Sequence, residues 1–309
     1  MDYLKKENTG TTIRMPSVAN LMIDSDDRNN SPAGLTLNQV SPWEFTIYQN
    51  QNLQNGFFTR INCSELVLEW CNPNISPYLD NQNFSIDVSG TTQPGVGTFV
   101  GTIPMGFYTV ESLIKELTKG LNAQAAAAGS PFTFTSAGAD GFAAITAVGC
   151  VMRWTPGFNT ALKDLLTLLP ANVINPGAYT SDFLIGLCPD LRAYRYLDFI
   201  SDELTYAQTV KDSSTQSANR NVLFRWYFDE DVPEQYDGYG FPIMMGYKPF
   251  NRRRLFNPPK QIRWVDNLPV GNVKFEVLTN LGTPPATVIN PYTLQAESSF
   301  LMTLQLSEN

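Results

Sequence analysis

The stretch "RINCSELVLEW", residues 60–70, alternates between apolar and polar side chains as a β-strand does. Its apolar members occupy every second position with one slip, at Ile61, Cys63, Leu66, Leu68 and Trp70. A two-residue period places one set of side chains on one face of a sheet. A one-residue slip in that period is what an inserted residue produces at a β-bulge. The stretch therefore predicts a half-buried strand that carries a bulge at the slip.

Further segments of the same kind follow along the chain. They include "SPWEFTIYQ" (41–49), "NFSIDVSG" (83–90), "YRYLDFISDEL" (194–204), "NRNVLFRWYFDE" (219–230), "GNVKFEVLTNLG" (271–282) and "SSFLMTLQLSE" (298–308). About eight to ten short strands with few helices are typical of a β-sandwich or barrel. Alternation alone does not choose between a jelly roll and other sandwiches.

One segment has the period of a helix instead. In "IPMGFYTVESLIKELTKGLN", residues 103–122, the apolar side chains that recur on one helical face are Val110, Leu113, Ile114, Leu117 and Leu121. Thr109 stands before them as a candidate N-cap, and Glu111 lies in the first turn, where the helix dipole favours an acid. "NTALKDLLTLLP" (159–170) predicts a second, shorter helix that ends at Pro170.

The pattern of the chain suggests one long all-β domain with an N-terminal extension. Residues 1–40 have little apolar patterning and predict an extended arm, with "NLMID" (20–24) as a short anchoring segment. Residues 41–309 predict the sandwich. Within it, 124–192 and 229–260 are long excursions between strands, and each is a candidate insertion.

The composition excludes several kinds of chemistry. The chain has no histidine among its 309 residues, which excludes a Ser-His-Asp triad and a His-ligated metal centre. The net charge of −8 argues against nucleic acid as a main partner. Only 16% of the residues are charged, and a surface that is polar without charge suits permanent subunit contacts. No apolar run reaches the length of a membrane span.

Four clusters of residues are candidate functional sites. The acids at 24, 26 and 27 lack the glycine and glutamate that an EF-hand loop requires, and the four cysteines (63, 71, 150 and 188) lie too far apart for a zinc knuckle.

The acidic, tyrosine-rich stretch "FDEDVPEQYDGYG" (228–240) could form a glycosidase-like or carbohydrate-binding loop, although a solvated loop is the simpler interpretation. Its acids are Asp229, Glu230, Asp231, Glu234 and Asp237. The basic triplet 252–254, with Lys248, Lys260 and Arg263 nearby, indicates an ion-paired loop or a contact with an acidic neighbour. We therefore predict a non-enzymatic protein without catalytic, cofactor-binding or metal-ligating residues.

Several segments in order resemble the small capsid proteins of virophages and polinton-like double-stranded DNA viruses. The resemblance is carried by "IDSDDR" (23–28) ahead of "SPWEFTI" (41–47), "TIPMGFYTVESLIKELTKGLN" (102–122), "YLDFISDELTYAQTVKDSST" (196–215), "IRWVDNLPVGNVKFEVLTNLG" (262–282) and "FLMTLQLSE" (300–308). It covers most of residues 20–309 and is weakest over 124–190. The order of these segments carries the resemblance, since each of them alone is unspecific.

This resemblance implies a single jelly-roll β-sandwich with one or two short helices in the interstrand connections. At 309 residues the chain has the length of the penton protein rather than that of the double jelly-roll major capsid protein. The expected function is then a structural minor capsid protein, a homopentamer at the five-fold vertices of an icosahedral particle that contacts major capsid protein trimers. Such a protein is made in the host cytoplasm and resides in the virion. The alternatives are another jelly-roll capsid or cement protein that forms trimers, a jelly-roll spike that binds carbohydrate or a receptor, and a glycosidase that uses Asp and Glu.

Overall fold

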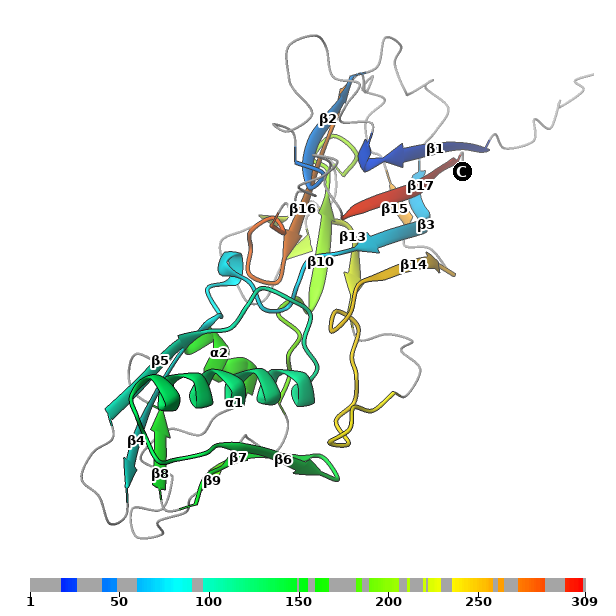
Figure 1. Cartoon of the computed structure of the whole chain (residues 1–309). Coiled ribbons are helices and arrows are strands. Elements are labelled where there is room, and N and C mark those ends of the chain that lie inside the picture. Colours follow the sequence, from blue (N-terminus) through cyan, green and yellow to red (C-terminus); the bar gives the residue numbers. More distant parts are fainter. Residues whose placement is uncertain are drawn as a thin grey trace, which may run out of the picture.

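The computed structural model describes residues 18–26, 41–48, 60–90, 97–148, 150–154, 159–166, 182–184, 189–205, 210–211, 219–220, 222–228, 235–257, 261–263, 272–286 and 298–307. These residues form two lobes joined side by side (Figure 1). One lobe is a sandwich of two sheets, and the other combines short sheets with both helices.

The first sheet of the sandwich is built around the stretch 60–70, which forms the strand β3 (Arg60–Trp70). We call it the β3 sheet. Its order is β1-β17-β3-β14, every pairing is antiparallel, and β15 continues the edge that β14 begins. The other bounds are β1 (Val18–Asp24), β14 (Phe250–Leu255), β15 (Gln261–Arg263) and β17 (Ser299–Ser307).

The second sheet, here the β10 sheet, has the order β13-β10-β16-β2 and is also antiparallel. Its strands are β2 (Glu44–Tyr48), β10 (Tyr196–Ile200), β13 (Val222–Tyr227) and β16 (Asn272–Thr279). When the eight principal strands are numbered along the chain, the two sheets have the orders 1-8-3-6 and 2-7-4-5. This is the connectivity of a jelly roll. The predicted all-β class and jelly-roll fold are therefore confirmed.

The two sheets enclose an aromatic core. Phe300 of β17 lies at the centre, with the ring of Trp43 stacked at 6.2 Å, Phe45 at 6.0 Å and Phe199 edge-on at 5.0 Å between centroids. All four side chains are buried. Because these rings come from both sheets, the burial of large aromatic surfaces holds the sandwich closed.

The predicted bulge in β3 is confirmed. Glu65 pairs with Thr303 of β17, whereas Cys63 pairs with Leu304, so Ser64 is the extra residue on β3. The Ser64 hydroxyl donates to the Thr303 carbonyl at 3.2 Å, and the Ser64 carbonyl accepts the N–H of Phe256. The bulge restores the inward direction of Leu66, Leu68 and Trp70, which would otherwise face solvent.

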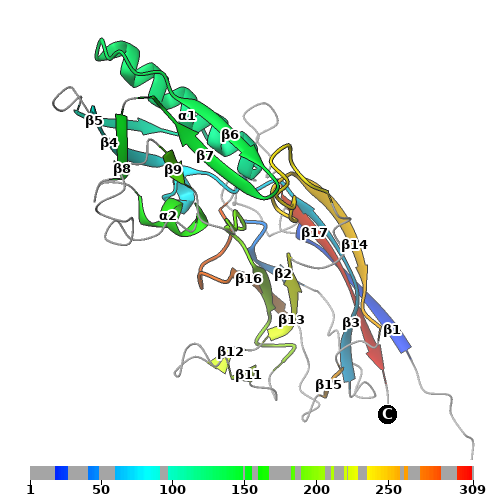
Figure 2. The ribbon, with the colours of Figure 1, turned by 90° about the horizontal axis from the view of Figure 1, so that it is seen from below.

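The second lobe begins directly after β3 and ends before β10. It contains a three-stranded sheet of order β5-β4-β8 and another of order β6-β7-β9. Their bounds are β4 (Asn83–Gly90), β5 (Gly97–Thr102), β6 (Thr135–Ala139), β7 (Phe142–Thr146), β8 (Cys150–Trp154) and β9 (Asp182–Leu184). The helices α1 (Val110–Ala127) and α2 (Thr160–Leu166) belong to this lobe, and a 3-10 turn (Pro77–Leu79) lies at its entrance. A two-stranded hairpin, β11 (Val210–Lys211) with β12 (Asn219–Arg220), stands apart on the sandwich side (Figure 2).

The second lobe has its own hydrophobic core, to which α1 contributes the face predicted from its period. Val110, Leu113, Ile114, Leu117 and Leu121 are all buried there, against Phe84, Phe99 and Ile145 of the sheets. Thr109 caps the helix as predicted, because its side chain accepts the N–H of Ser112 while the Ser112 hydroxyl accepts the N–H of Thr109. The predicted second helix is present as α2, with 167–170 outside the described residues.

Two elements differ from the expectation. Val18–Asp24, inside the segment expected to be an arm, form β1 and pair with β17 over seven residues. Burial alternates along β1, but the exposed positions include the apolar residues Val18 and Met22, so the sequence itself alternates only weakly. Likewise Phe250–Leu255, inside the expected excursion 229–260, form β14. Its three consecutive arginines conceal the alternation between core-side and solvent-side positions.

Candidate functional site

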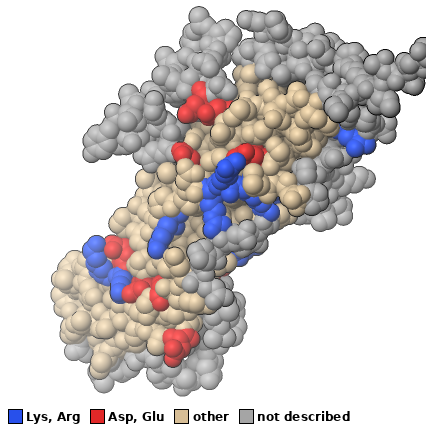
Figure 3. Space-filling view, turned by 90° about the vertical axis from the view of Figure 1, so that its right-hand side faces the viewer, with Lys and Arg blue, Asp and Glu red and all other residues tan. Residues whose placement is uncertain are grey.

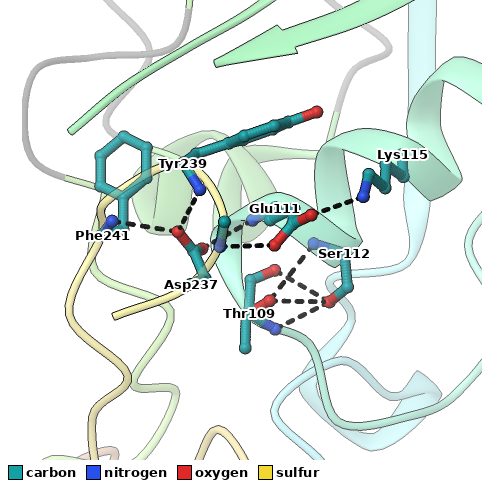
Figure 4. A network of polar contacts seen from close by, with 8 residues as sticks. Thr109, Glu111, Ser112, Lys115, Asp237, Tyr239 and Phe241 are labelled. Atoms are coloured by element: carbon teal, nitrogen blue, oxygen red, sulfur yellow. Dashed lines mark hydrogen bonds and ion pairs between the residues drawn. The ribbon is translucent and has the colours of Figure 1, made fainter. Parts of the chain in front are cut away.

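The acidic, tyrosine-rich loop predicted as a candidate site is described from residue 235 onward, and its first four acids, at 229–234, lie outside the described residues. The described part crosses from the sandwich to the second lobe and meets the start of α1 (Figure 4). Asp237 lies at this meeting point. Its Oδ2 accepts the N–H of Glu111 at 2.9 Å, and its Oδ1 accepts the N–H groups of Tyr239 and Phe241, both at 3.0 Å. Asp237 therefore caps α1 from outside the helix and at the same time closes its own turn.

Glu111 forms the reciprocal contact. Its Oε2 accepts the N–H of Gly238 at 2.6 Å, and its Oε1 accepts a hydrogen bond from Lys115 one turn along the helix. Lys115 and, second, the Gly238 N–H lower the pKa of the Glu111 carboxyl below its ordinary value, since both stabilise the charged form. The two carboxylates are thus engaged by backbone donors, which is the arrangement of an anchor between two chain segments.

Close packing reinforces this anchor. A Cβ on Gly138 of β6 would lie 2.3 Å from the Tyr239 ring, so only glycine lets the ring lie flat on the strand. Gly240 has a φ of +82°, and a Cβ there would lie 2.9 Å from the Gly141 nitrogen. The Gly141 N–H donates to the Tyr239 carbonyl at 2.8 Å. Tyr239 and Phe241 are buried in the core of the second lobe, so we call residues 235–247 the strap.

A second polar cluster lies where the chain enters and leaves the second lobe. The Asn74 amide donates to the carbonyls of Tyr108 and Leu191, at 2.9 and 3.3 Å, and its Oδ1 accepts the Tyr108 N–H. Tyr247 of the strap accepts the N–H of Leu191 at 2.7 Å. Asn74 is buried at the entry of the lobe, and its amide is satisfied by backbone groups of the segment before α1 and of the exit of the lobe. Its role was not predicted, because the sequence shows only two asparagines close together in "CNPN" (71–74).

The basic triplet lies on β14, at one edge of the β3 sheet. The side chain of Arg253 is 65% exposed and pairs with Glu65 of β3. Arg254 is paired in register with Leu66, on the side that faces the sandwich, and its guanidinium lies 5.8 Å from the Trp226 ring of β13. Figure 3 shows Lys and Arg side chains gathered in the middle of this side of the molecule, with Asp and Glu side chains directly beside them. The triplet is therefore an ordered edge of the sandwich, in line with the ion-paired interpretation.

The outer face of the β10 sheet carries an ion pair that the sequence did not reveal. Arg225 of β13 binds Asp198 of β10 through two hydrogen bonds, of 2.6 and 2.8 Å. The Asp198 side chain is fully buried, whereas that of Arg225 is 31% exposed. Tyr196 and Tyr227 flank the guanidinium, with the Tyr196 centroid at 3.8 Å. The hydrogen bonds to Asp198 raise the pKa of Arg225, so the guanidinium stays charged.

The remaining candidates form no site in the described part of the chain. No group of three or more Cys, Asp or Glu side chains there could hold a metal ion. Asp24 and Asp26 lie at the end of β1, where the Asp24 carboxylate accepts the N–H of Asp26, and Asp27 is outside the described residues. Cys63, Cys71 and Cys150 are free thiols, and Cys188 is outside the described residues. No described helix is both long enough and apolar enough to cross a bilayer.

Taken together, the fold defines a class: a single jelly roll with a second lobe inserted between its third and fourth strands. Among solved structures, the mavirus penton protein is similar to this chain with a TM-score of 0.51 and 10% sequence identity. The similarity covers 96% of this chain and 100% of that one. A chain in the cryo-EM structure of the Sputnik virophage covers 95% of this chain and 98% of its own, with a TM-score of 0.48 and 12% identity. No protein-family model and no curated protein matches the sequence. The predicted resemblance to a virophage penton is confirmed at the level of the fold.

Proposed function

We propose that the protein is a structural capsid protein of the penton type, which closes the five-fold vertices of an icosahedral particle as a homopentamer. The observation that carries the proposal is the similarity to the mavirus penton protein along essentially the whole of both chains. A similarity restricted to the jelly roll would fit many unrelated proteins, because this fold recurs in capsids and lectins. Here it extends to the second lobe as well, and the order of sequence segments points to the same proteins.

The free edges of the sandwich support a role in assembly. In the described residues, β1 and β14 border the β3 sheet, and β2 and β13 border the β10 sheet. Edge strands present unpaired backbone groups that proteins cover or protect. In a cyclic ring every subunit contacts its two neighbours through the same pair of surfaces, so both surfaces are covered in every copy. The ring closes with five subunits when the rotation that relates one subunit to the next is one fifth of a turn.

The division of the chain follows from this proposal. In this proposal the chain before Ser41, of which the structure describes residues 18–26, contacts the inner surface of the shell or a neighbouring subunit. The jelly roll begins at β1, and residues 74–191 form the insertion. The partners are further copies of this chain and the major capsid protein trimers around the vertex. The protein acts without catalysis, cofactor or metal, is made in the host cytoplasm and resides in the virion.

The test is to locate the protein in particles that contain it. Icosahedral reconstruction by cryo-electron microscopy should fit the described residues into density at the five-fold vertices. Brief chemical cross-linking of the same particles should give a ladder of this chain that ends at five copies. Density at three-fold positions with a ladder that ends at three would overturn the proposal in favour of a trimeric cement protein.

A further inference from the structure

The β3 sheet ends in two open edges whose strands run in opposite directions. Each of the three pairings that lead from β1 to β14 is antiparallel, so β1 and β14 are antiparallel to each other. The two strands are similar in length, with seven residues in β1 and six in β14. In the described part of the chain, neither has a second strand beside it. Two copies laid side by side would therefore continue one antiparallel sheet, with β1 of one copy next to β14 of the other.

Both edge strands expose large apolar side chains. Met22 of β1 and Leu255 of β14 are each 64% exposed, and Val18 of β1 is exposed as well. Among the sandwich strands, as far as the structure describes their side chains, Tyr227 of β13 is the other large apolar residue that is exposed. An edge strand that exposes apolar side chains is a strand that readily pairs with another chain. Single exposed apolar residues are ordinary, so the positions of Met22 and Leu255 decide what they mean.

The register of the sheet places these two residues in one row. Met22 lies opposite Thr303 of β17. Leu255 lies opposite Glu65 of β3, which is itself paired with Thr303. The row crosses the outer face of the sheet, because the next row begins with the buried Ile23. Within one chain, three strand spacings keep Met22 and Leu255 about 14 Å apart. When β1 of the next copy continues the row beside β14, its Met22 becomes the direct neighbour of Leu255.

The same register brings opposite charges together on the outer face. If Met22 of the next copy lies opposite Leu255, antiparallel pairing places its Asp24 opposite Arg253. Arg253 is the exposed arginine of β14, whereas the two arginines beside it face the sandwich. Both groups already have contacts within the chain, Arg253 with Glu65 and Asp24 with the N–H of Asp26. The contact between copies adds to these, and opposite charges at directly opposed positions stabilise a pair of strands.

We infer that β1 of one copy pairs with β14 of the next, antiparallel and with Met22 opposite Leu255, as the repeated heterologous contact of a ring. The inference rests on the proposed penton function and names the strands through which its subunits meet. The contact covers both open edges of the β3 sheet in every copy. A shift by two residues would preserve the faces but place Met22 opposite Arg253, so the register is defined. Pairing between two β1 strands would end at a dimer and leave β14 open in both copies.

The inference is tested by disulfide formation in the full chain that carries Met22→Cys and Leu255→Cys. Mild oxidation of the concentrated protein should give a ladder of covalent oligomers that ends at five copies on a non-reducing gel. The two introduced thiols cannot join within one chain, because a disulfide requires Cα atoms within about 7 Å of each other. The wild type and each single variant should give no ladder, and a mixture of the two single variants should stop at dimers.

Two matched controls separate this contact from random collision. Val18→Cys with Leu255→Cys uses another exposed position on the same face of β1, about 13 Å along the strand from Met22, and should give no ladder. In sedimentation velocity, Met22→Lys should weaken self-association about tenfold or more, because it removes the apolar pair and adds a cation beside Arg253. Val148→Lys changes an exposed apolar residue of the second lobe and should leave association unchanged. Circular dichroism should give the same β-sheet spectrum for every variant.

The outcomes distinguish this contact from the proposed function. A ladder that is no stronger for the pair 22 and 255 than for the pair 18 and 255 would overturn the inference. A chain that stays monomeric at its highest soluble concentration would overturn it too. Both results leave the vertex location untouched, since that is read from particles. A ladder that ends at three copies, with the register control unlinked, would keep the contact and overturn the homopentamer instead.

Discussion

Asp237 joins two lobes with one carboxylate. It accepts three backbone N–H groups, one at the start of α1 and two in the strap, so that a helix of the second lobe and a loop of the sandwich share one anchor. Hydrogen bonds to a charged acceptor are stronger than those between neutral groups, and unmaking them leaves buried donors unsatisfied. Neither contact could be predicted from the sequence, because the strap and the helix are more than 120 residues apart.

Asp237→Ala should destabilise the second lobe by about 1–3 kcal/mol, because three donors lose their acceptor. The measurement is hydrogen exchange followed by mass spectrometry. Exchange should accelerate at the amides of Glu111, Tyr239 and Phe241 and remain unchanged in β3. Asp164→Ala on the exposed side of α2 is the control and should leave all of these rates as they are. Equal rates in the Asp237 variant and the wild type would contradict the role of Asp237 as an anchor.

Gly138→Ala should destabilise the protein by about 1–3 kcal/mol, the range for overpacking a filled site. The new methyl group meets the Tyr239 ring at its attached end, where the ring cannot swing away without moving the strap. Urea denaturation followed by tyrosine and tryptophan fluorescence measures the change. Ala139→Ser, on the exposed neighbour in β6, should behave as wild type. If the urea midpoint of Gly138→Ala equals that of the wild type within error, the strap moves aside at no cost in stability and the prediction is wrong.

At the scale of elements, a described strand or helix could be predicted from the period of its apolar residues where one of its faces is buried. β3, β16, β17 and α1 were predicted because burial on one side gives a clean period. β1 and β14 were not, since they are edge strands with mostly exposed or charged side chains. β10 and β13 were predicted as strands, but the pairing of Asp198 with Arg225 was not. A pairing between strands depends on register, which a single sequence does not contain.

Arg225→Ala should cost about 3 kcal/mol of stability, because the fully buried Asp198 carboxylate loses the charge and the two hydrogen bonds of Arg225. This is the lower end of the usual range, since Arg225 keeps some contact with solvent. Asp198→Leu combined with Arg225→Met should cost less than Arg225→Ala alone, because no buried charge then remains. Thermal unfolding of the single and double variants measures both. If the double variant is the least stable, the pair contributes more than the desolvation argument allows.

At the scale of the whole molecule, the sequence did not locate the inserted lobe. Its strands β4 and β5 alternate like those of the sandwich, and only their packing into a separate core distinguishes them. The expected excursion began at residue 124, whereas the chain leaves the sandwich after Trp70. The hydrogen bond by which the buried Asn74 joins the entry of the lobe to Leu191 at its exit is seen only in the structure.

Replacing residues 75–190 by a short Gly-Ser linker should leave a folded jelly roll. Asn74 and Leu191 are within hydrogen-bonding distance, and every buried member of the sandwich core lies outside the excised range. Tyr239→Ser and Phe241→Ser should be included, because the strap would otherwise expose these rings. The shortened chain should keep a β-sheet circular dichroism spectrum and one cooperative thermal transition. A spectrum without β structure would show that the sandwich requires the second lobe.

The antiparallel pairing of β1 with β17 brings the two ends of the described chain to one end of the molecule. Val18 lies opposite Ser307, and Ser307 lies opposite Arg60 at the beginning of β3, whereas Trp70 at the far end of β3 leads into the second lobe. Both ends of the described chain therefore leave from one pole, and the lobe occupies the other (Figure 1). Labels attached at Val18 and at Ser307 would therefore lie close to each other and far from the second lobe.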